Sequence, residues 1–64
     1  MDYNFYLFVQ LRNVIMPTTT EYDLQFEIDC AMYEDFLNSS FNNENENLYE
    51  CICDYLYLSK SKLN

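Results

Sequence analysis

Cysteine and histidine, the side chains that form structural zinc sites, are few in this chain. Cys51 and Cys53 are separated by one residue, Cys30 is the third cysteine, and histidine is absent. A structural zinc site needs four Cys or His ligands, with about two to four residues between paired cysteines. We therefore expect no metal site and interpret the cysteines as small, reduced, largely apolar side chains. A disulfide from Cys30 to either of the others would require an oxidising compartment.

The residues needed for nucleophilic or phosphoryl chemistry are also missing. Without histidine there is no imidazole to act as a general base, and without glycine there is no glycine-rich phosphate loop. Glu34 and Asp35 are adjacent in sequence, so on a helix their carboxylates diverge and do not converge on one substrate atom. The sequence predicts a protein that is not an enzyme and that uses no cofactor.

The remaining chemistry is electrostatic. Eleven acidic residues stand against three basic ones, which gives a formal net charge of −8. A field of this sign repels nucleic acids and anionic membranes and attracts basic surfaces. We therefore expect no direct contact with nucleic acid or membrane, and a basic protein surface as partner. The alternative explanation is that the excess acid only keeps the protein dispersed.

The most regular acidic pattern lies in residues 21–30 (EYDLQFEIDC). Strict alternation of apolar and polar residues predicts a strand, with neighbouring positions of one face roughly 6.6–6.8 Å apart. Two phosphate steps of a DNA strand, ~3.4 Å each, cover a similar distance. We predict that this face carries the central partner contacts, which neighbouring acids extend: Asp23, Glu27 and Asp29, with Glu21, Glu34 and Asp35. The opposite face is predicted as core: Tyr22, Leu24, Phe26, Ile28 and Cys30.

Residues 3–15 also alternate and predict a first strand, which pairs with 21–30 in an antiparallel β-hairpin. Pro17 and the three threonines that follow it break the pattern, as a turn does. Tyr6 and Phe8 lie on the outer face of this first strand, where another element covers them or a partner binds them. A helix that begins at the threonines is the alternative, since Thr18 and Glu21 have capping-box spacing.

After the hairpin the period changes, and residues 31–38 predict a short helix with Asp29 as a possible N-cap. An asparagine-rich loop follows. Residues 47–59 predict either a helix or a third strand: β-propensity favours the strand, whereas acids near the start and lysines near the end favour the helix. We favour the helix, and we expect residues 59–64 to fray. The fold class is then a single α+β domain over residues 1–64.

The N-terminus lacks the positive start and unbroken apolar run of a signal peptide. No stretch approaches the ~20 apolar residues of a membrane span. A cytoplasmic protein is expected, in the host cell cytoplasm if the gene is phage-encoded.

In size, acidity, aromatic content and AT-rich coding style, the chain resembles small phage- or plasmid-encoded inhibitors. These include DNA mimics, anti-restriction proteins, uracil-DNA glycosylase inhibitors and anti-CRISPR proteins. The likeness covers the whole chain in character, and no sequence motif is shared. It implies a viral protein that occupies the nucleic-acid site of a host defence or DNA/RNA-processing enzyme and excludes the substrate.

A different function fits the aromatic residues. Tyr6, Phe8 and the tyrosine-rich C-terminal segment would form an apolar docking face. The chain would then be a non-catalytic interaction module, such as a homodimer, an antitoxin or an assembly subunit.

Overall fold

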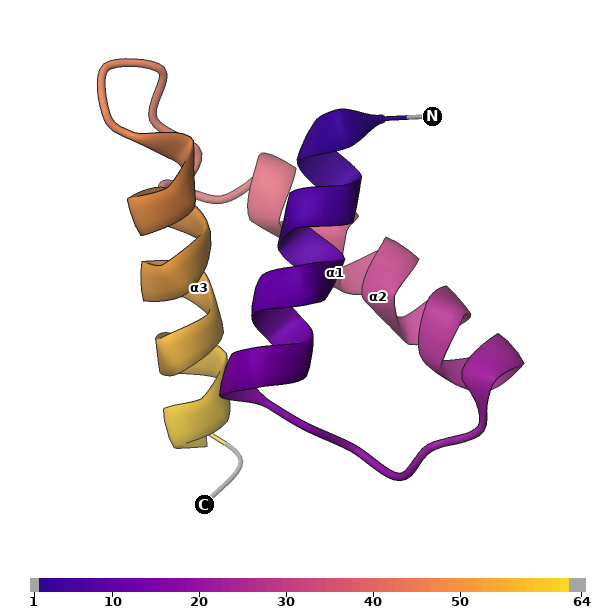
Figure 1. Cartoon of the computed structure of the whole chain (residues 1–64). Coiled ribbons are helices and arrows are strands. Elements are labelled where there is room, and N and C mark those ends of the chain that lie inside the picture. The colour runs from indigo at the N-terminus through magenta and orange to yellow at the C-terminus, as the bar shows by residue number, and fades with distance from the viewer. Residues whose placement is uncertain (1, 63–64) are drawn as a thin grey trace.

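The structure is a computed structural model that describes residues 2–62, and this range folds into three helices. Helix α1 spans Tyr3–Ile15, α2 spans Tyr22–Leu37 and α3 spans Leu48–Lys62. Helices α1 and α3 lie side by side and run in the same direction, while α2 returns in the opposite sense and crosses behind α1 (Figure 1). Within the described range no helix combines the length and apolar character needed to cross a membrane.

The predicted β-hairpin of residues 3–15 and 21–30 is wrong, and with it the α+β class. Both segments are helical, and residues 2–62 contain no strand, so the described fold is all-α. In α1 the side chain of Asp2 caps the helix by accepting a hydrogen bond from the Asn4 N–H at 3.0 Å. Phe8, Leu11 and Ile15 then recur at helical spacing and are buried.

Helix α2 was mistaken for a strand because its packing face is partly polar. The residues directed to the other helices are Gln25, Asp29, Met32, Tyr33 and Phe36, spaced three, four or one apart as one side of a helix requires. Tyr22, Leu24, Phe26 and Ile28, predicted as core, are instead exposed. The predicted short helix of residues 31–38 is the C-terminal half of α2.

The loop between α1 and α2 contains the predicted break at Pro17. Thr18 does not cap a helix: its Oγ1 accepts a hydrogen bond from the Thr20 N–H at 3.0 Å, and α2 begins only at Tyr22. Glu21 precedes α2 without making a side-chain capping bond. The alternative of a helix following the threonines was therefore closer to the structure than the strand was.

The helical interpretation of the C-terminal segment is confirmed, and the third strand is wrong. Helix α3 has Glu50 in its first turn and Lys60 and Lys62 in its last, the charge order that its dipole favours. It continues through Lys62, so residues 59–62 are helical where fraying was expected. Residues 63–64 lie outside the described range.

Aromatic rings make up most of the core. Phe8 and Phe36 are fully buried, and Phe8 packs against Phe36, Tyr33 and Tyr55 with ring centroids 5.4–6.1 Å apart. Phe5, Phe26 and Phe41 extend this network at its edges. Large rings supply much buried area per residue, which a chain of 64 residues needs.

A buried ion pair joins α1 to α2. The Arg12 guanidinium donates from Nε to Asp29 Oδ1 at 2.8 Å and from Nη2 to Asp29 Oδ2 at 3.2 Å, and both side chains are 4% exposed. Gln25 donates a further hydrogen bond to Asp29 Oδ1, and Arg12 Nη1 donates to the carbonyl of Met16. The pair is therefore bidentate and supported on both sides, which offsets the cost of burying two charges.

Loss of Asp29 should be severe. Asp29→Ala leaves the buried Arg12 cation unpaired, which costs about 3–5 kcal/mol, whereas a chain of this length has roughly 3–10 kcal/mol of total stability. We expect a mostly unfolded or strongly destabilised protein in urea denaturation followed by helical circular dichroism.

The apolar double variant Arg12→Met/Asp29→Leu should recover much of that stability, since it removes both charges together. As a control, Glu27→Gln, exposed and away from both ends of α2, should stay within about 0.5 kcal/mol of wild type. An Asp29→Ala protein as stable as wild type would show that the pair does not hold the two helices together.

Candidate functional site: the acidic surface

The charge on the described surface is almost entirely negative. Of the eleven acidic residues only Asp29 is buried, and the other ten are exposed. The base Arg12 is buried with Asp29, which leaves Lys60 and Lys62 in the last turn of α3. Over residues 2–59 the exposed surface therefore carries carboxylates and no basic side chain.

Three of these carboxylates line the outer side of α2. Asp23, Glu27 and Glu34 are spaced by four and seven positions, so they share one side of the helix, opposite to the side that buries Asp29 and Phe36. At about 1.5 Å rise per residue they lie about 6 Å and about 10.5 Å apart along the axis. We call these three residues the α2 acidic stripe.

The other predicted acidic contacts are placed differently. Glu21 is exposed at the start of α2. Asp35 is exposed but accepts a hydrogen bond from the Tyr55 hydroxyl of α3 at 2.7 Å, so it is directed away from the stripe. Asp29 is buried against Arg12 and presents no surface to a partner. The predicted ladder of Asp23, Glu27 and Asp29 is thus not formed, and Glu34 completes the row in place of Asp29.

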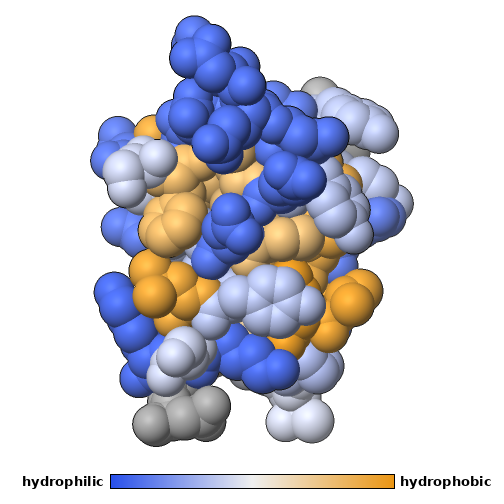
Figure 2. Space-filling model, turned by 90° about the vertical axis from the view of Figure 1, so that its left-hand side faces the viewer, coloured by the Kyte–Doolittle hydropathy of each residue, from blue (hydrophilic) through white to orange (hydrophobic). Residues whose placement is uncertain are grey.

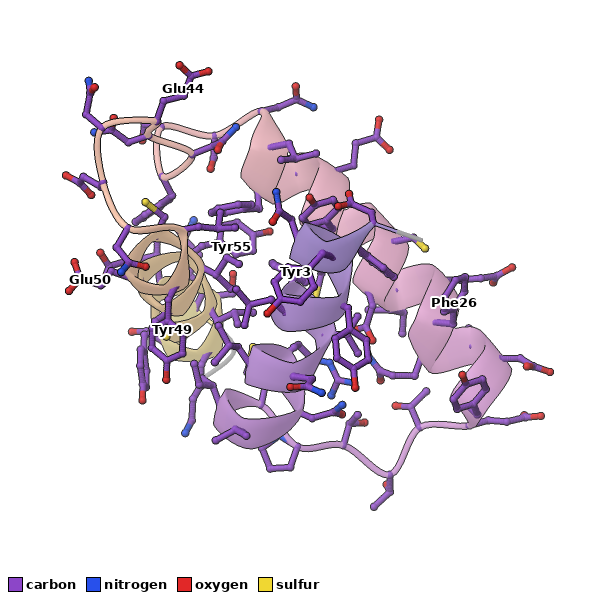
Figure 3. All side chains as sticks on the ribbon, turned by 45° about the horizontal axis from the view of Figure 1, so that its top comes forward. Tyr3, Phe26, Glu44, Tyr49, Glu50 and Tyr55 are labelled. Atoms are coloured by element: carbon purple, nitrogen blue, oxygen red, sulfur yellow. The ribbon has the colours of Figure 1, made fainter. Side chains whose placement is uncertain are left out.

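A second acidic group lies in the α2–α3 loop and the first half of α3, and it was not among the predicted site residues. It comprises Glu44 and Glu46 of the α2–α3 loop with Glu50 and Asp54 of α3, and we call it the loop–α3 cluster. Figure 3 shows Glu44 and Glu50 projecting outward where the loop enters α3. Glu46, Glu50 and Asp54 are four residues apart, a signal that appears in the sequence once this segment is interpreted as a helix.

The two aromatic residues predicted as partner contacts lie in different environments. Tyr6 is 51% exposed on the outer side of α1, whereas Phe8 is fully buried at the centre of the aromatic core and cannot contact a partner. Their spacing of two places them on different sides of a helix, although it would have placed them on one face of a strand.

Figure 2 shows the face formed by α3, where a hydrophilic cap lies above an apolar band.

The three cysteines are free thiols that differ in exposure. Cys51 is buried, Cys53 is half-buried and Cys30 is exposed. Burial raises the pKa of the Cys53 thiol, and the nearby carboxylates of Asp54 and Glu50 raise it further, so this thiol stays protonated at neutral pH. Within residues 2–62, no three Cys, Asp or Glu side chains meet in a way that could hold a metal ion.

The acids of the last turn of α2 oppose the helix dipole. Glu34 and Asp35 lie at its carboxyl end, where the turn contains no basic residue, and each such carboxylate is unfavourable by about 0.3–1 kcal/mol. Within the α2 acidic stripe this cost falls on Glu34 alone, because Asp23 lies in the first turn, where the dipole favours an acid.

No protein-family model, no curated protein and no solved structure matches this chain.

The dipole argument predicts opposite effects for two matched substitutions. Glu34→Gln should raise the free energy of unfolding by about 0.3–1 kcal/mol, because it removes a negative charge from the C-terminus of α2. Glu50→Gln should lower it by a similar amount, because Glu50 lies at the favourable N-terminus of α3. Urea denaturation at low salt measures both, and the two effects should shrink in 1 M salt. A Glu34→Gln protein less stable than wild type would show that the charge of Glu34 does not oppose the dipole of α2.

The buried tyrosine gives a second test, by pH. Burial raises the pKa of Tyr55 to about 12, and the hydrogen bond to Asp35 adds to the shift. Because the folded pKa lies above the unfolded value of about 10, the contribution of Tyr55 to stability is complete below pH 10 and is lost as the pH rises toward 12. Ultraviolet titration of phenolate should show a late-ionising tyrosine that Tyr55→Phe removes. Its persistence in Tyr55→Phe would assign the late step to another residue.

Proposed function

We propose that this protein is a small acidic inhibitor that binds the basic, nucleic-acid-binding surface of a host defence or DNA/RNA-processing enzyme and excludes its substrate. One observation carries the proposal. Ten carboxylates are exposed on the surface of residues 2–62, and the only exposed basic side chains of this range are in the last turn of α3. Carboxylates without neighbouring cations keep their full field, which draws a basic protein surface toward them.

The α2 acidic stripe supports the same function by its geometry. The axial intervals of about 6 Å and about 10.5 Å are of the same order as two and three phosphate steps of a nucleic-acid strand, ~6.8 Å and ~10.2 Å. Arg and Lys side chains arranged for phosphates would form charge-assisted hydrogen bonds with such carboxylates. A helix holds the three carboxylates at regular intervals along its axis, which a loop does not do.

Exposed aromatic side chains lie beside the stripe. Tyr22 is 83% exposed and Phe26 51% exposed, and the two are one helical turn apart next to Asp23 and Glu27. Figure 3 shows Phe26 on the outer part of α2, away from α3. Aromatic anchors of this kind carry much of the affinity of protein interfaces.

A second candidate function rests on α1. Tyr3, Tyr6 and Val14 share its outer side and are all more than half exposed. This apolar side fits the interaction module, in which docking depends on contact area and little on charge. Two copies of the chain would each bring a charge of −8, which opposes self-association, so a different partner is favoured over a homodimer.

The proposed function predicts that binding depends on the stripe. Immobilised wild-type protein is exposed to nuclease-treated host lysate at low salt and eluted with a salt gradient or with duplex DNA. We expect a nucleic-acid enzyme that elutes late in salt and that DNA displaces. The triple variant Asp23→Asn/Glu27→Gln/Glu34→Gln should bind it at least about tenfold more weakly, since three charge pairs of about 0.5–1 kcal/mol each are lost.

The matched control is Glu44→Gln/Glu46→Gln/Glu50→Gln, which makes the same charge change in the loop–α3 cluster. It should retain binding within about threefold. Equal weakening by the two triple variants would mean that net charge acts without a defined site. Binding that ignores salt and the stripe but is abolished by Tyr6→Ala would support the interaction module instead.

A further inference from the structure

An apolar groove opens between the three helices near the C-terminal ends of α1 and α3. Its volume is about 740 Å³, within the range of about 300–1,000 Å³ typical of small-molecule sites. The C-terminal end of α1 forms one wall with Ile15, Met16 and Pro17, and α2 forms another with Ile28 and Met32. Methionine side chains are flexible and polarizable, so they adapt to alkyl chains of different shape.

The charge of this groove is opposite to that of the rest of the surface. None of the eleven acidic residues lines it, but two of the three basic residues, Arg12 and Lys60, do. Arg12 is neutralised by Asp29. Lys60 is exposed, and among the described residues no carboxylate lies within ion-pair distance of its ammonium group.

We propose that this groove binds a medium-chain amphiphilic carboxylate. Its alkyl chain lies against Met16, Ile28 and Met32, and its carboxylate accepts a hydrogen bond from the ammonium group of Lys60. Burial of the alkyl chain drives binding, and Lys60 selects an anionic head over a neutral or cationic one. Because no acid lines the groove, this site is separate from the acidic surface that attracts a basic partner.

Three eight-carbon probes with different heads test the proposal on the full chain. Octanoate, 1-octanol and octylammonium are each titrated while the methyl resonances of Met16, Ile28 and Met32 are followed by NMR. Octanoate should shift these methyls with saturable, one-to-one binding, and octanol should bind about three- to fivefold more weakly because it lacks the ion pair. Octylammonium should bind more weakly than octanol, because its head has the same charge as Lys60, although the negative protein attracts it.

Two lysine variants with the same charge change separate the groove from the net charge. Lys60→Gln should weaken octanoate about three- to fivefold and leave octanol unchanged, whereas Lys62→Gln, outside the groove, should leave both unchanged. Ile28→Gln, at an exposed wall position that should not impair folding, should weaken octanoate and octanol alike. The proposal is overturned if octanoate gives no saturable shift, if octylammonium shifts the same methyls as strongly, or if the two lysine variants weaken octanoate equally.

Discussion

The bidentate pair between Arg12 and Asp29 is the contact on which the arrangement of α2 depends. Near its first turns α2 offers the core little apolar surface, because Tyr22, Leu24 and Ile28 are exposed. What joins this end to α1 is the Arg12–Asp29–Gln25 group and the edge-to-face contact of Phe26 with Phe5 at 5.9 Å. At this end, the direction in which the outer side of α2 faces is therefore set by a polar contact that tolerates little change in geometry. At the other end it is set by the rings of Tyr33 and Phe36 packed on Phe8.

The same pair shapes the electrostatics of the whole molecule. One acid and one base neutralise each other inside, so the formal charge of −8 is carried by the surface. The carboxylates at the C-terminal end of α2 oppose its dipole and lower stability. The aromatic network around Phe8 and Phe36 supplies the compensating burial. A stable interior thus coexists with a surface on which like charges repel one another.

Those parts of the fold that local rules govern were predictable from sequence. The charge order of residues 48–62 indicated a helix, and Pro17 indicated the break. Helix α2 was not predictable by periodicity, since its packing positions include Gln25 and Asp29, whose partner Arg12 lies 17 residues away from Asp29. Phe8 was placed on an outer face because residues 3–15 were interpreted as a strand, and a helix directs this side chain to the other side. The acidic character of the site was visible in the composition, but which acids share a face depends on the helix.

The contacts that hold α2 differ from those between α1 and α3, and this difference affects how the chain moves. Helices α1 and α3 share apolar core residues, whereas the start of α2 is held by one polar group and one ring contact. We therefore expect its first two turns to open at a lower free energy than α1 and α3, as a local unit without global unfolding. Amide hydrogens there are then expected to exchange by this opening. A partner seated on the outer side of α2 would have to close it, so part of the interaction energy is used to order the helix, and amide protection in these turns reports occupancy directly.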